Sequence, residues 1–259
     1  MAAPDTEIND VEQPLIAHLL ELRTRLVRIL MGVGLVLIPL VFFARDIYAF
    51  LARPLLALMP VGTSMIATEV ASPFFAPFKL AAVLAFVLAL PWVLYQIWAF
   101  VAPGLYKSEQ RLILPLLATS TLLFYAGMSF AYFVVFPLIF GFFVSVAPEG
   151  VAVMTDIASY LDFVLGMFVA FGIAFETPVA IVLMVWSGFV TPAKLASARP
   201  YVLVGAFVIG MLLTPPDILS QSLLAVPAYL LYELGIIAAR WLVPGIREVE
   251  AQQANQSSD

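Results

Sequence analysis

The sequence contains no cysteine and a single histidine, His18, among its 259 residues. Without cysteine, neither a disulfide framework nor a thiolate metal site is possible. One histidine excludes a multi-histidine metal site and leaves no serine–histidine chemistry at membrane depth. No G-x-x-x-x-G-K-[ST] segment is present, so the chain has no P-loop for hydrolysing nucleotide. We therefore expect no metal and no other cofactor.

Charge is also scarce. Charged residues make up 11% of the chain and hydrophobic residues 63%, with a mean hydropathy of +1.06, whereas soluble domains carry about 25% charged residues. A chain this apolar cannot cover itself with polar surface in water. Lipid must therefore be its solvent. The net charge of −5 argues against nucleic acid as a partner. These numbers predict an all-α integral membrane protein.

Six apolar segments predict transmembrane helices, each of which needs about 20 residues to cross the hydrocarbon. We expect these spans at residues 26–43, 73–100, 112–140, 160–186, 201–213 and 219–242. The fifth would be only about 20 Å long as a helix, which is short for a bilayer. We expect one membrane domain over residues 15–245, with polar tails over 1–14 and 246–259.

The basic residues predict the orientation of these spans. With the N-terminus in the cytoplasm, nine fall on the inner side: Arg23, Arg25, Arg28, Lys107, Arg111, Lys194, Arg199, Arg240 and Arg247. Only two, Arg45 and Arg53, fall outside. The positive-inside rule therefore predicts that both termini are cytoplasmic and that Gly62 and Glu149 lie outside.

Residues 15–28 predict an amphipathic helix leading into the first span. Its apolar face holds Leu15, Leu19, Leu22 and Leu26, and its polar face holds His18, Glu21, Arg25 and Arg28. From the spacing alone, this is a helix at the cytoplasmic interface. It carries an i,i+4 pair of Glu21 with Arg25, worth about 0.3–0.5 kcal/mol. His18 belongs to the solvated face and receives no chemical role.

Two further carboxylates lie in predicted connections between spans. Glu109 follows an aromatic boundary segment and the turn-forming Pro103-Gly104 pair, and by itself it is a solvated loop residue. Asp217 follows Thr214 and two prolines, where it would cap the sixth helix. Neither position alone indicates a function.

Glu176 differs because it lies well inside the fourth predicted span. Insertion scales assign about 2.5–3.5 kcal/mol to an acidic side chain at the centre of the bilayer. It is either a functional carboxyl or a neutral one that is hydrogen-bonded to a neighbouring helix. Pro178 predicts a kink beside it, and Gly166, Ala170 and Ala174 form a small-residue stripe suited to close helix packing.

Four segments together resemble one family. They are H-L-L-E-L-R-T-R (His18–Arg25), the 19 residues Pro91–Glu109, F-E-T-P (Phe175–Pro178) and T-P-P-D (Thr214–Asp217). In this order, on a six-span chain, they resemble TatC, the receptor family of the twin-arginine protein translocase, over about residues 14–245. The resemblance implies a concave, glove-like arrangement of six helices with short fifth and sixth helices.

The resemblance also implies a function in the bacterial inner membrane. TatC-like proteins are not enzymes. They bind twin-arginine signal peptides of folded precursor proteins and export these proteins together with the single-span partners TatA and TatB. Transport uses the proton-motive force, which fits the missing P-loop. Membrane lipid and other TatC copies are the remaining partners expected.

Site residues follow from the matched motifs. The acids at Glu21 and Glu109 are expected to contact the arginine pair, and Phe100 and Leu105, close to Glu109 in sequence, could supply an apolar wall for the rest of the signal. The resemblance assigns functional importance to Pro54, Glu176 and Asp217. It assigns partner-helix contacts to Met211, Thr214 and Gln221.

Two other functions fit parts of the sequence. A proton-coupled transporter of small solutes would use Glu176 as its proton carrier, and it predicts an inverted repeat that the sequence does not show. An intramembrane hydrolase would need a nucleophile and base, or a metal pair, at membrane depth. His18 lies outside the predicted spans, so the sequence offers no such base.

Overall fold

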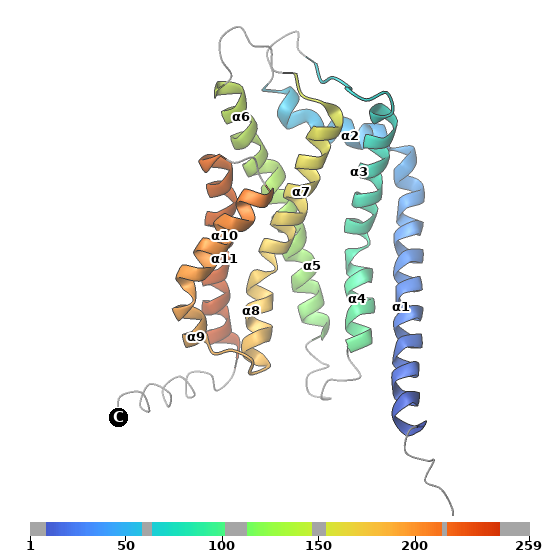
Figure 1. The fold of residues 1–259 in the computed structure, drawn as a ribbon, viewed down its shortest axis with the longest axis vertical. Coiled ribbons are helices and arrows are strands. Elements are labelled where there is room, and N and C mark those ends of the chain that lie inside the picture. Colours follow the sequence, from blue (N-terminus) through green and yellow to red (C-terminus); the bar gives the residue numbers. More distant parts are fainter. Residues whose placement is uncertain (1–8, 59–63, 102–112, 147–153, 214–216, 244–259) are drawn as a thin grey trace, which may run out of the picture. The chain divides into compact units, whose positions relative to one another are not determined.

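The computed structural model describes residues 9–58, 64–101, 113–146, 154–213 and 217–243 (Figure 1). These residues are almost entirely helical, which confirms the all-α prediction. The short connections between the described helices include one isolated bridge, between Ile66 and Asp156. The predicted site residues Leu105, Glu109 and Thr214, and the positions Gly62 and Glu149, lie outside the described residues.

The helices follow one another with short interruptions. They are α1 (Asn9–Phe42), α2 (Ala44–Leu56), α3 (Ser72–Leu88), α4 (Leu90–Val101), α5 (Ile113–Phe130), the π-helical segment η3 (Ala131–Val135), α6 (Phe136–Val146), α7 (Ile157–Phe175), α8 (Thr177–Trp186), α9 (Pro192–Ser197), α10 (Arg199–Leu213) and α11 (Ile218–Leu242). Within the described ranges, four helical stretches are long and apolar enough to cross a membrane, and the bent pair of α3 and α4 would make a fifth.

The chain divides into two compact units. One comprises Met1–Ile47 and Pro77–Ala118, and the other comprises Tyr48–Ala76 and Thr119–Asp259. In the first unit α1 packs against α4. In the second, α11 packs against α8 and α10.

Helix boundaries refine the predicted spans. The first helix begins at Asn9, before the predicted start at residue 15. The second span bends by 52° between α3 and α4, where Pro91 lacks an amide hydrogen and crowds the preceding turn. The expectation of a short sixth helix is wrong, because α11 has 25 residues and is about 37 Å long. Of the predicted fifth and sixth helices, it is α10, with 15 residues, that is short.

The start of α7 is fastened to the segment before α3. Asp156 caps α7, its Oδ1 accepting from the backbone N–H groups of Ala158 and Ser159, each at 3.0 Å. Its Oδ2 accepts from the backbone N–H of Thr68 at 2.9 Å and from the Thr68 hydroxyl at 2.8 Å. Donation from the Ser159 and Thr68 N–H groups holds the pKa of the Asp156 carboxyl well below its usual range. We call this contact, with the Ile66–Asp156 bridge, the α7 tether.

In the second unit, α5 and α7 approach each other closely at two glycines. A Cβ on Gly127 would lie 2.4 Å from the backbone oxygen of Phe171, and one on Gly172 would lie 2.5 Å from the Phe124 ring. At Gly166, the first residue of the predicted small-residue stripe, a Cβ would meet nothing within 4 Å. The glycines at this close approach are therefore outside the stripe, although Ala170 of the stripe is buried.

Candidate functional site

Glu21 pairs with Arg25 as its spacing predicts, but Arg25 does not lie on a solvated face. Arg25 Nη2 lies 3.1 Å from Glu21 Oε1. The same guanidinium donates to Gln96 Oε1 at 3.1 Å and to the backbone oxygen of Ala99 at 3.3 Å, both on α4. The Arg25 side chain is 20% exposed and that of Glu21 is 36% exposed. Arg25 therefore joins α1 to α4, while the Glu21 side chain remains partly exposed.

Two aromatic contacts flank this ion pair. The exposed His18 ring stacks on Phe100, with ring centroids 4.3 Å apart. Trp92 Nε1 donates to the backbone oxygen of Arg28 at 3.0 Å. Its ring leaves no room for a side chain at Gly32, where a Cβ would lie 2.5 Å from Cδ1. Glu21 and Phe100, two of the predicted signal-binding residues, therefore belong to the same α1–α4 contact.

The Glu21 carboxylate has remaining capacity for a cationic ligand. An ionised carboxylate offers about four lone-pair positions, and Arg25 engages one oxygen through Nη2. A second guanidinium can therefore bind Glu21 without displacing the first. The Phe100 ring lies on the neighbouring His18, and its role as an apolar wall for a signal stays a prediction.

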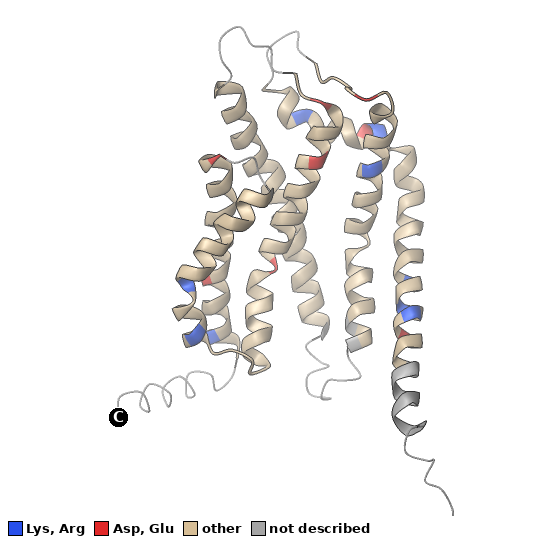
Figure 2. Ribbon diagram, in the orientation of Figure 1, with Lys and Arg blue, Asp and Glu red and all other residues tan. Residues whose placement is uncertain are grey.

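Glu176 lies where the fourth predicted span breaks. α7 ends at Phe175 and α8 begins at Thr177, so the kink predicted from Pro178 is present. The Ser120 hydroxyl on α5 hydrogen-bonds the carboxyl. Glu176 Oε1 is buried without a hydrogen-bond partner among the described groups. Figure 2 shows how few charges the helices carry between their ends, and the Ser120 hydroxyl is the polar group that meets the Glu176 side chain.

Pro54 explains an unusual contact of α2. Because proline has no N–H, it cannot donate to the Phe50 carbonyl one turn earlier. The Tyr132 hydroxyl in η3 donates to that carbonyl instead, at 2.9 Å. A similar bond runs from the Tyr160 hydroxyl to the backbone oxygen of Leu51 at 2.7 Å. Pro54 thus frees an acceptor that fastens α2 to the helices beside it.

Asp217 is the N-cap of α11, as the sequence predicted. Its Oδ1 accepts from the backbone N–H of Ser220 at 2.7 Å. Asp217 Oδ2 and the Ser220 hydroxyl are both buried, and neither has a hydrogen-bond partner in the described part of the chain. The position is therefore a structural cap, and a functional role for it stays a prediction.

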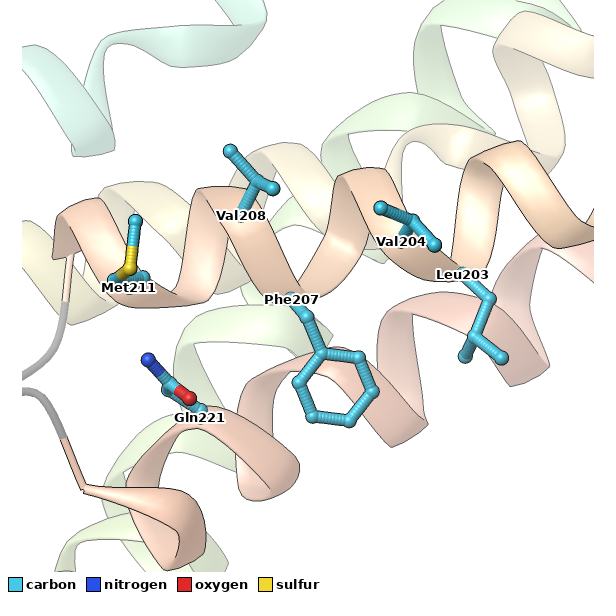
Figure 3. A pocket seen from close by; sticks show the side chains of 6 residues that line it. All are labelled: Leu203, Val204, Phe207, Val208, Met211 and Gln221. Carbon is cyan, nitrogen blue, oxygen red and sulfur yellow. The ribbon is translucent and has the colours of Figure 1, made fainter.

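Met211 and Gln221 line one groove between α10 and α11, of about 410 Å³ (Figure 3). The remaining lining residues are Leu203, Val204, Phe207 and Val208, all on α10. Gln221 is the one polar side chain among the six. A Cβ on Gly210 would lie 3.5 Å from the backbone oxygen of Gln221, so the two helices approach closely beside the groove. The third predicted partner contact, Thr214, lies outside the described residues.

A second ion pair holds these helices together and was not predicted. Arg199, at the start of α10, donates from Nε and Nη2 to the two carboxylate oxygens of Glu233 on α11, each at 2.7 Å. The Tyr232 hydroxyl donates to the Leu195 oxygen of α9 at 2.7 Å. Sequence spacing could not reveal these pairs, since their partners are 34 and 37 residues apart.

Known proteins resemble this chain over most of its length. The family model for the Sec-independent protein translocase protein (TatC) matches residues 17–227. The TatC protein of Azotobacter chroococcum is 60% identical over 235 residues, which are 91% of each chain. That of Escherichia coli K12 is 58% identical over 231 residues, covering 89% of this chain and 90% of the relative. A crystal structure described as the twin-arginine translocase receptor TatC is 38% identical, with a TM-score of 0.75, over 86% of this chain and 98% of that one.

Proposed function

Because the chain belongs to the TatC family of Sec-independent protein translocases, we propose that it binds twin-arginine signal peptides of folded precursor proteins. With TatA and TatB, it exports these proteins across the bacterial inner membrane, using the proton-motive force. Its several apolar helices fit a multi-pass protein of that membrane. Membership of this family gives no support to the two other functions, a small-solute transporter and an intramembrane hydrolase.

The observation that carries the proposal is the partly exposed Glu21 carboxylate, which lies one helical turn after His18, the residue whose ring stacks on Phe100. A signal arginine presents a planar fork that matches a carboxylate through two parallel hydrogen bonds, and a lysine ammonium cannot reproduce this pairing. We propose that Glu21 binds one arginine of the pair and Glu109 the other. Phe100 and Leu105 supply apolar surface for the residues that follow.

The proposed function is tested with the purified protein in detergent. An immobilised peptide carrying the R-R pair should retain the protein, and a matched K-K peptide should retain much less at the same salt concentration. Equal retention by the two peptides would contradict recognition of the arginine pair.

For the partners, we propose that the α10–α11 groove docks a transmembrane helix of TatA or TatB, and that other TatC copies complete the receptor complex. α10 is only about 22 Å long, so the bilayer beside it must thin or a partner must cover the gap. Gln221 gives an apolar groove one hydrogen-bonding group. A hydrogen bond between helices in a membrane contributes about 0.6 kcal/mol, and up to nearly 2.

Photo-crosslinkers placed at Met211, Thr214 or Gln221 should therefore capture TatA or TatB in membranes. A crosslinker at Leu230 is the control, because this side chain lies on α11 outside the groove and is 56% exposed, against 53% for Met211. Equal capture at Leu230 would indicate random collision in the membrane, and the groove would not be the docking site.

Replacing Glu176 by glutamine should preserve more transport than replacing it by alanine. An amide keeps an acceptor for the Ser120 hydroxyl and adds a donor, whereas alanine leaves that hydroxyl without its partner. One hydrogen bond contributes about 0.5–1.5 kcal/mol, so we expect transport rates about 2- to 10-fold apart. Export is measured in cells and signal-peptide binding in detergent, and binding should be unchanged in both variants. Equal loss of transport in the two would instead favour an ionised carboxylate.

A further inference from the structure

The guanidinium of Arg25 lies at the centre of the α1–α4 contact. It donates to three acceptors: a carboxylate oxygen on its own helix, and the Gln96 side chain and Ala99 carbonyl on α4. Gln96 is 1% exposed, so its amide oxygen is a fixed acceptor that cannot turn toward water. Arg25 is therefore held from α4, and through it Glu21 is held as well.

This arrangement restricts the Glu21 carboxylate. A free glutamate side chain loses rotational entropy worth about 1.5–2 kcal/mol when it is fixed. In this structure the bond from Arg25 to Glu21 Oε1 restricts the rotamers of that side chain before any ligand arrives, so part of this entropy is already lost. The restriction matters for an arginine ligand in particular, because bidentate pairing requires a defined carboxylate plane, whereas an ammonium binds as a point charge.

We propose that Arg25 is a positioning residue for recognition of the arginine pair. Anchored to α4, it orients the Glu21 carboxylate, occupies one side of Oε1, and leaves Oε2 and the other side of Oε1 for the two hydrogen bonds of a signal arginine. This inference rests on the proposed function, since it assigns Arg25 a role at the same site. A lysine at position 25 keeps the charge, but its single ammonium lacks the planar fork that reaches both helices.

The test is a double-mutant cycle in the full-length protein, with R-R and K-K peptides titrated at fixed salt. Arg25→Lys should weaken R-R binding about 3- to 10-fold, the effect of losing about one hydrogen bond. K-K binding should change little, so the discrimination between the peptides falls. Gln96→Leu, which removes the anchor from the other side, should act in the same direction. In a Glu21→Ala background, Arg25→Lys should have no further effect on binding, because Arg25 then has no carboxylate to position for the ligand.

Arg28→Lys is the matched control, because Arg28 lies on the same helix and bonds to α4 through its backbone oxygen, which the substitution keeps. It should leave both affinities unchanged. If the effects of Arg25→Lys and Glu21→Ala add, or if R-R and K-K binding fall together, Arg25 only supports the fold and the inference is wrong. If Glu21→Ala itself leaves R-R binding intact, the assignment of Glu21 in the proposed function fails instead.

Discussion

Alanine at Glu21 or at Glu109 is expected to weaken binding of the R-R peptide about 10- to 100-fold. A hydrogen bond to a charged group contributes about 1.5–3 kcal/mol, and each substitution removes one carboxylate from the proposed pair. At Glu21 the variant also leaves Arg25 with its α4 acceptors alone. Arginine at Glu109 should weaken binding further, because it adds repulsion to the lost attraction.

These variants are measured by titrating purified protein with R-R and K-K peptides at one salt concentration. Both acids lie outside the predicted hydrocarbon segments, so yield and thermal stability should match those of the parent protein. Arg28→Lys is again the control, because it changes a side chain at the same face of the membrane without removing a carboxylate. If both alanine variants bind the R-R peptide as tightly as the parent, the twin-carboxylate site is wrong.

Alanine at Gly127 is expected to destabilise the protein by about 1–3 kcal/mol, the usual effect of overpacking. Its Cβ would lie 2.4 Å from the Phe171 backbone oxygen, and a backbone atom on a packed helix cannot move aside as a flexible side chain can. The higher helix propensity of alanine, up to about 1 kcal/mol, offsets only part of this effect.

Gly166→Ala is the matched comparison, since a Cβ there meets nothing within 4 Å. This variant should be neutral or slightly more stable than the parent. Thermal unfolding in one detergent would compare the two, and equal melting temperatures would contradict the close approach of α5 and α7.

Local sequence signals predicted much of this fold. Apolar composition predicted the helices, Pro178 predicted the break at Glu176, and the cap at Asp217 and the pairing of Glu21 with Arg25 followed from their spacing. All of these depend on residues within a few positions of each other, where helix geometry fixes the relation between side chains.

The contacts that shape the candidate site could not be predicted in this way. Arg25 meets Gln96, 71 residues later, and the carbonyl freed by Pro54 meets Tyr132, 82 residues after Phe50. Such pairings depend on which helices become neighbours, and one amphipathic pattern is compatible with several neighbours. Gly166 of the small-residue stripe shows the same limit, because size alone does not say which glycine faces another backbone.

The α7 tether has a consequence for the order in which the chain assembles during synthesis. Its two halves, Thr68 and Asp156, are 88 residues apart, and α3 to α6 lie between them. Ribosomes add about 5–20 residues per second, so the earlier half must wait roughly 4–18 seconds before its partner has been made. Contacts of such high sequence separation form late. The segment before α3 therefore stays unfastened while the next helices enter the bilayer, and the start of α7 closes this part of the fold only after they are in place.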